Sequence, residues 1–184
     1  MHYPVFLDLR SRPVAVVGGG KVASAKIPGL VAAGAQVTVI APRIDPGIRG
    51  VATIAREFRP EDLDGVWFAV AAATPEVNRA VAEAAAQRRV FVNAVDDKDA
   101  ATAYLAGVVR KGPVTLAVST GGNAPALAGL LREALEAILP DDLAEWTRIA
   151  GELRARWKAA SVPMAERRPL LLDALNRIYR RPLS

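Results

Sequence analysis

The most informative segment of the chain is Pro13-Val-Ala-Val-Val-Gly-Gly-Gly-Lys-Val-Ala23. A β-branched run enters a triple glycine, and a helical segment then extends over 21–33. The pattern Gly18-x-Gly20-x-x-Ala23 suits a tight turn, the close approach of a pyrophosphate and close helix packing, in that order. Strand, glycine turn and helix together predict a dinucleotide site, with a ligand-free βα turn as the simpler alternative.

Short apolar runs continue to alternate with helical segments along the first half of the chain. Strands are predicted over 37–40, 52–58, 66–71 and 90–93, and a helix over 75–88. This alternation predicts a parallel, doubly wound α/β sheet, in which ligands lie at the carboxyl ends of the strands. Four loops fall at such ends: Gly18–Gly20, Ala41–Arg43, Ala73–Thr74 and Asn93–Asp96.

Several polar residues in these loops have more than one interpretation. The second strand ends at Arg43 without the acid that commonly holds the NAD ribose, so Arg43 suits NADP, the adenine ring or a plain surface loop. Asn78, in the first turn of a helix, lies either near a cofactor or on the surface. One of the three acids in the loop Asn93–Asp99 can act as a general base, or these acids only make a turn soluble.

The second half departs from this alternation. Two strands are predicted over 103–109 and 113–118, followed by the glycine-rich loop Ser119-Thr-Gly-Gly-Asn-Ala-Pro125 and a helix over 125–138. The loop suits an anion such as a carboxylate, or is a helix start capped by Asn123. Two more helices follow, separated at Val162–Pro163, and their apolar stripes predict a second copy of the chain as partner.

Composition narrows the function classes. The 184 residues include no cysteine and a single histidine, His2, which excludes disulfides and predicts no thiolate or histidine metal site. No signal peptide or membrane-length apolar run is found, so we expect a cytoplasmic protein without a membrane partner. The net charge of +5 is concentrated in residues 147–184, where nine Lys+Arg face three Asp+Glu. Without an accompanying motif, this basic segment predicts a solvated face rather than nucleic-acid binding.

Taken together, the motifs identify a family. The chain resembles the N-terminal module of siroheme synthase, the precorrin-2 dehydrogenase/sirohydrochlorin ferrochelatase family. The matching segments occur in family order: Tyr3-Pro-Val-Phe-Leu-Asp-Leu, Val16-Val-Gly-Gly-Gly-Lys-Val-Ala, Ala71-Ala-Ala-Thr, Asn93-Ala-Val-Asp-Asp, Leu116-Ala-Val-Ser-Thr-Gly-Gly-Asn-Ala-Pro-Ala-Leu and Leu130-Leu-Arg-Glu-Ala-Leu-Glu.

The resemblance implies a domain plan and an activity. An NAD-binding Rossmann domain would span 1–112, a dimerisation region 113–146 and a helical domain 147–184. The implied activity is oxidation of precorrin-2 to sirohydrochlorin by a homodimer with NAD as hydride acceptor, followed in some members by ferrous iron insertion. A non-catalytic module that binds a nucleotide or tetrapyrrole on the same fold is the alternative.

The resemblance also implies site residues. Asp96 falls on the family's proton-accepting aspartate. Contacts to the cofactor would come from eight residues at strand ends: Gly18, Gly20, Lys21, Val22, Pro42, Arg43, Thr74 and Asn93. Contacts to the tetrapyrrole would come from the loop Ser119, Thr120, Gly121, Gly122 and Asn123.

Overall fold

The chain forms two compact units. A computed structural model describes residues 2–179, and its internal contacts divide the chain into Met1–Leu105 and Ala106–Ser184. Residues 180–184, with Arg180 and Arg181 of the predicted basic segment, lie outside the described residues. Each unit is described by itself.

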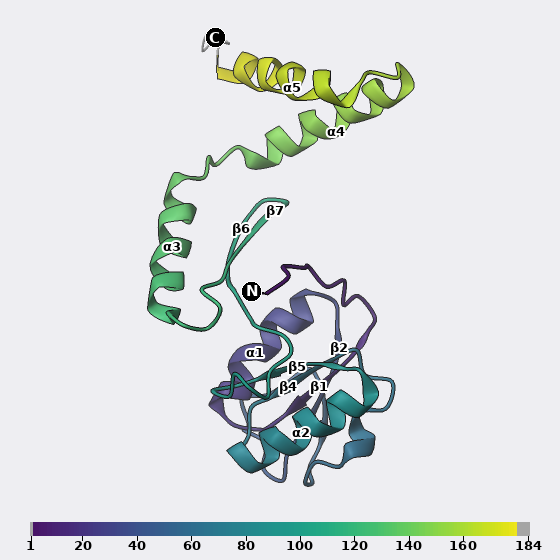
Figure 1. The fold of residues 1–184 in the computed structure, drawn as a ribbon, viewed down its shortest axis with the longest axis vertical. Coiled ribbons are helices and arrows are strands. Elements are labelled where there is room, and N and C mark those ends of the chain that lie inside the picture. The colour runs from purple at the N-terminus through teal and green to yellow at the C-terminus, as the bar shows by residue number, and fades with distance from the viewer. Residues whose placement is uncertain (1, 180–184) are drawn as a thin grey trace. The chain divides into compact units, whose positions relative to one another are not determined.

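The first unit is built on a five-stranded parallel sheet with the order β3-β2-β1-β4-β5. β1 is central, and Val17 at its carboxyl end is in register with Ile40 of β2 and Ala71 of β4. The ends of these strands therefore meet along one edge (Figure 1). The strands are β1 (Pro13–Val17), β2 (Gln36–Ile40), β3 (Ala52–Ile54), β4 (Phe68–Ala71) and β5 (Phe91–Ala94).

Helices cover both faces of this sheet, as a doubly wound fold requires (Figure 1). α1 (Lys21–Ala32) packs Ala23, Ile27 and Leu30 onto one face, and α2 (Pro75–Arg88) packs Val81, Ala84 and Ala85 onto the other. Alternate residues of β1 point to the two cores, with Val14 and Val16 facing α1. The short 3-10 helix η1 (Pro60–Leu63) lies on the α2 face through Leu63. The predicted doubly wound sheet is confirmed.

The first unit differs from the sequence predictions in detail. Residues 2–9 form neither a helix nor a strand. α1 continues through Pro28 and ends at the predicted place, where Gly34 takes a φ of +76°. β3 has three residues rather than the seven predicted over 52–58, because only Ala52–Ile54 pairs with β2 at the edge of the sheet.

The second unit begins with an antiparallel hairpin, β6 (Gly107–Lys111) and β7 (Val114–Val118), which turns at Gly112 with a φ of +57°. α3 (Pro125–Ile138) contacts both strands of this hairpin. α4 (Leu143–Ala159) and α5 (Met164–Tyr179) follow and contact each other. The three predicted helices are confirmed, whereas β6 starts at Gly107 and not at residue 103.

A hydrogen-bond chain joins the two last helices. Trp146 Nε1 donates to the Tyr179 hydroxyl over 2.9 Å, and that hydroxyl donates to Asp142 over 2.8 Å. Burial of the phenol and its bond to the Asp142 carboxylate raise the pKa of Tyr179. Among the described residues, no helix is long and apolar enough to cross a membrane.

Candidate functional site

The glycine turn after β1 is fixed by its neighbours. The Gly18 N–H donates to the Ile40 carbonyl over 2.9 Å, and the Ala72 N–H donates to the Val17 carbonyl over 2.8 Å. Gly18 has a φ of +127°, and a Cβ added there would clash with the Ala72 carbonyl oxygen. The protein's own packing therefore explains why residue 18 is glycine.

Gly20 is different because nothing in the protein fills the space beside it. A Cβ built on Gly20 would have no heavy atom within 4 Å, and its φ of −93° suits any residue. Gly20 is the N-cap of α1, whose first-turn N–H groups have no intrahelical acceptors. Lys21 and Val22 in that turn are exposed. An open approach to a helix N-terminus fits a dinucleotide pyrophosphate.

The loop after β2 lies against the same turn. The Asp45 N–H donates to the Gly19 carbonyl over 2.8 Å, and a Cβ on Gly19 would clash with the Arg43 carbonyl oxygen. Pro42 and Arg43 are both exposed beside the turn. The structure thus brings these two residues next to the glycines, and their contact with a cofactor stays a prediction.

Thr74 ends the loop after β4 and is the N-cap of α2. Its side chain is exposed at the same edge of the sheet. Hydrogen bonds from the backbone N–H of Glu76 and from the Thr74 hydroxyl lower the pKa of the Glu76 carboxyl.

The end of β5 carries Asn93 and the loop with Asp96. Asn93 is buried, and its Nδ2 donates to the Ala103 carbonyl over 3.0 Å, so part of this amide already serves the fold. Asp96 is exposed and has a φ of +59°, a left-handed backbone that costs a non-glycine residue about 1–2 kcal/mol. Asp97 is turned to the backbone, where its Oδ1 accepts from the Ala100 N–H over 3.1 Å.

The loop Ser119–Asn123 belongs to the second unit. Ser119 Oγ accepts from the Gly121 N–H and Thr120 Oγ1 accepts from the Ala124 N–H, both over 3.2 Å. The N-cap of α3 is Ala124, without a side-chain cap. The alternative that Asn123 caps this helix is therefore wrong, because the helix begins one residue later, with Ala124 as its N-cap. The Thr120 hydroxyl accepts from the N–H of Ala124.

Comparison with protein families identifies the first unit. Residues 5–107 match the model of the family described as "Putative NAD(P)-binding". The chain belongs to this NAD(P)-binding family. The match covers the whole sheet of the first unit, including the glycine turn and the loops beside it. Residues 111–138 match a second family, described as "Sirohaem biosynthesis protein central".

Individual relatives confirm the resemblance found in the sequence. Siroheme synthase 3 of Aeromonas hydrophila is 44% identical over 174 residues, which are 91% of this chain and 37% of that protein. Siroheme synthase of Zymomonas mobilis is 37% identical, over 97% of this chain and 39% of its own length. The chain thus spans little more than a third of these relatives. The solved structure of SirC, a precorrin-2 dehydrogenase, matches with a TM-score of 0.75 and 28% identity, covering 99% of this chain and 94% of that one.

Burial separates the two interpretations that the sequence left open for Asn78. Asn78 is 3% exposed, so its interpretation as a surface residue is wrong. Its side chain bonds to the backbone at Ala73 and at Val95, in two different loops. The sequence feature that could have predicted these bonds is an asparagine in the first turn of a helix, because its short amide can bond to nearby backbone groups.

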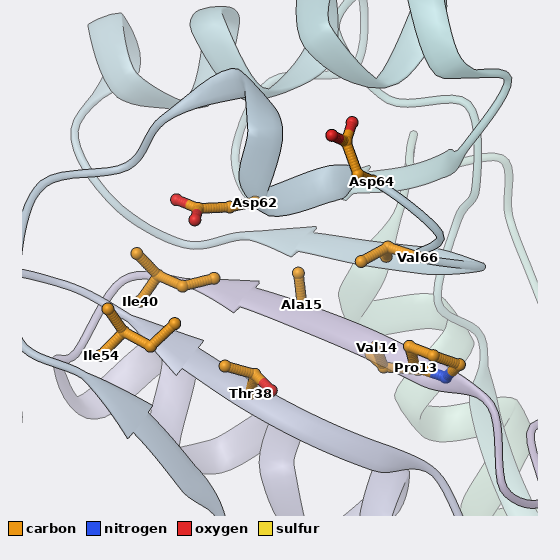
Figure 2. A pocket seen from close by; sticks show the side chains of 9 residues that line it. All are labelled: Pro13, Val14, Ala15, Thr38, Ile40, Ile54, Asp62, Asp64 and Val66. Atoms are coloured by element: carbon orange, nitrogen blue, oxygen red, sulfur yellow. The ribbon is translucent and has the colours of Figure 1, made fainter.

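A cavity in the NAD(P)-binding unit lies away from these residues. It has a volume of about 310 Å³ and lies on the η1 face of the sheet, with Asp62 and Asp64 on one side and the β2 residues Thr38 and Ile40 on the other (Figure 2). Both carboxylates are paired, Asp62 with Arg56 and Asp64 with Arg88. No predicted site residue lines the cavity, so it is not part of the candidate site. Among the described residues, no cluster of side chains suited to a metal ion is found.

Proposed function

We propose that this chain is an NAD-dependent precorrin-2 dehydrogenase, which oxidises precorrin-2 to sirohydrochlorin. The observation that carries the proposal is the open space beside Gly20 at the start of α1, within a fold that matches a precorrin-2 dehydrogenase over nearly its whole length. In this reaction the substrate gives up a hydride and a proton, so the products are sirohydrochlorin, NADH and H⁺. Bound NAD would accept the hydride.

Residues at the ends of β1 and β2 bind the cofactor. The N–H groups of the first turn of α1 bind the pyrophosphate next to Gly20, and Pro42 and Arg43 flank the adenosine part. Because β2 is followed directly by Ala41-Pro42-Arg43, without the acid that holds the ribose hydroxyls in many NAD enzymes, the preference for NAD over NADP is itself part of the proposal.

Asp96 accepts the proton that leaves the substrate. Its carboxylate is exposed at the end of β5, two strands from the glycine turn, so it lies at the edge of the sheet where a cofactor would bind. We place Ser119, Thr120, Gly121, Gly122 and Asn123 at the carboxylate-bearing substrate, because their loop leads into the N-terminus of α3.

The test is an anaerobic assay with precorrin-2 and NAD. NADH absorbance and the sirohydrochlorin spectrum should rise together, and Asp96→Asn should remove most turnover while NAD still binds. If NAD binds and neither product forms, the chain is a binding module on this fold. If Asp96→Asn turns over like the wild type, another group accepts the proton.

Ferrous iron insertion into sirohydrochlorin is a second candidate activity. It is supported by the relatives, which are named siroheme synthases. Adding Fe²⁺ to the same assay after the dehydrogenation is complete tests it, because metal insertion changes the tetrapyrrole spectrum without further NADH.

We also propose that the chain acts as a homodimer in the cytoplasm. The second unit leaves apolar side chains of α3 exposed, and fully burying each would contribute about 1.5–3 kcal/mol. A second copy of this chain is always present in solution, so it is the simplest partner to cover these side chains. The large apolar side chains of α3 that are exposed are Leu127, Leu130, Leu131 and Ile138.

A further inference from the structure

Two loops at the ligand-binding edge of the first unit are tied together by one buried side chain. The Ala73 N–H donates to Asn78 Oδ1 over 2.9 Å, and Asn78 Nδ2 donates to the Val95 carbonyl over 3.4 Å. Ala73 follows β4 and Val95 follows β5, the neighbouring strand. The amide therefore bridges the ends of two parallel strands from the first turn of α2.

The bridge reaches both parts of the proposed site. On one side, the Ala72 carbonyl that precedes Ala73 stands directly against Gly18 of the glycine turn. On the other side, the Val95 carbonyl belongs to the same planar peptide group as the Asp96 N–H. A bond to this carbonyl holds the whole peptide group between Val95 and Asp96 in place. The φ angle of Asp96, +59°, is measured relative to that peptide group.

Only an asparagine-like amide meets both partners. One partner is an N–H donor and the other a carbonyl acceptor, so the side chain must accept on one atom and donate on the other. A carboxylate of the same shape would place an oxygen against the Val95 carbonyl. An aliphatic side chain would leave both backbone groups without this partner.

We propose that Asn78 is a positioning residue for Asp96. It holds the peptide that precedes Asp96 and so keeps the carboxylate at the edge of the sheet where the cofactor and substrate meet. This proposal rests on the proposed function for its kinetic consequence, but its structural part concerns residues of this chain alone.

The first test uses Asn78→Asp, which keeps an acceptor for Ala73 and removes the donor to Val95. Amide hydrogen exchange over residues 94–97 should become faster than in the wild type, in protein without NAD. The kcat for precorrin-2 should fall on the order of 10- to 100-fold, as expected when a reacting group is displaced by about 1 Å. The dissociation constant for NAD should stay within about threefold, because the contact at Ala73 is retained.

The matched control is Gln87→Glu, the same amide-to-carboxylate change at an exposed position of α2. It should leave exchange, kcat and NAD affinity unchanged. Asn78→Ala is the second variant, since it introduces no buried charge if Asn78→Asp folds poorly. It should also speed exchange over 94–97 and lower kcat.

A double variant separates positioning from general damage. In the Asp96→Asn background, Asn78→Asp should lower the residual turnover no further, because Asn78 acts through Asp96. An equal further loss in that background, or unchanged exchange over 94–97, would overturn the proposal. If the wild type does not oxidise precorrin-2, the proposed function fails, and the exchange result still decides whether Asn78 holds this loop.

Discussion

Gly18 and Ala72 touch so closely that residue 18 has no room for a side chain: a Cβ there would overlap the Ala72 carbonyl oxygen. This contact joins the turn after β1 to the loop after β4. A Cβ at Gly20, two residues on, would have no heavy atom of the protein within 4 Å. The two glycines of one motif therefore serve different purposes, which makes them separable by mutation.

Gly18→Ala should destabilise the first unit. The change adds an overlap with backbone and a strained positive φ, which together cost roughly 2–4 kcal/mol. Denaturant unfolding followed by circular dichroism measures the loss. A variant as stable as the wild type would mean that the Ala72 loop can move away without cost.

Gly20→Val should leave the fold nearly intact and weaken NAD binding. The space beside Gly20 is open, so we expect a stability change within about 1 kcal/mol, the range of an N-cap substitution. The added side chain occupies the approach to the first turn of α1, and calorimetric titration should show at least a tenfold weaker NAD affinity. Unchanged affinity would place the pyrophosphate elsewhere.

Asp62→Asn should destabilise the protein at neutral pH. Asp62 is nearly buried and accepts bonds from the Arg56 guanidinium at 2.5 and 2.8 Å and from the Arg59 N–H at 2.8 Å. The bond from Arg56 lowers the pKa of the Asp62 carboxyl. Its stabilising contribution is thus complete above the unfolded pKa of about 4 and is lost as the pH falls through the folded value.

We expect Asp62→Asn to cost about 1–3 kcal/mol at pH 7 and progressively less below pH ~4. Unfolding curves at several pH values measure this. Asp64→Asn is the control, because the Asp64–Arg88 pair is more exposed and is worth less than about 1 kcal/mol. A penalty that did not change with pH would show that the charge of Asp62 is irrelevant.

Leu130→Arg should shift the chain from dimer to monomer. Leu130 is 64% exposed on α3 and would be covered by the second copy, where an unpaired arginine is strongly unfavourable. Sedimentation velocity measures the change. Glu133→Arg introduces an arginine elsewhere on the exposed surface of α3 and should leave the dimer in place. A monomeric wild type would remove the basis for this proposal.

Local patterns predicted the core of the fold well. β1 and α2 have the predicted bounds because β-branched runs and helical periodicity are strong over those residues. The start of β6 was misplaced because Ala103 is held at β5, where its N–H donates to the Val92 carbonyl over 2.9 Å. Such a contact depends on the folded sheet and leaves no trace in the local sequence.

The candidate site was predictable to a similar extent. The strand order brings the glycine turn and the loops with Arg43, Thr74 and Asp96 to one edge, which parallel topology alone requires. The role of Asn78 was not predictable, because its partners at Ala73 and Val95 become neighbours only once β4 and β5 pair. Sequence motifs predict where the site loops are. The residues that hold these loops in place are recognised only from contacts in the folded structure.

The loops around the glycine turn are held by backbone contacts, with Gly18 against Ala72 and Gly19 against Arg43. A ligand that binds there meets peptide groups already in place, so little of the backbone is left to order. Its association should therefore lose little conformational entropy, and the heat-capacity change on binding should reflect buried surface rather than the ordering of chain. Affinity at this edge is then set mainly by the dipoles of the first turn of α1 and by the apolar area that the cofactor covers.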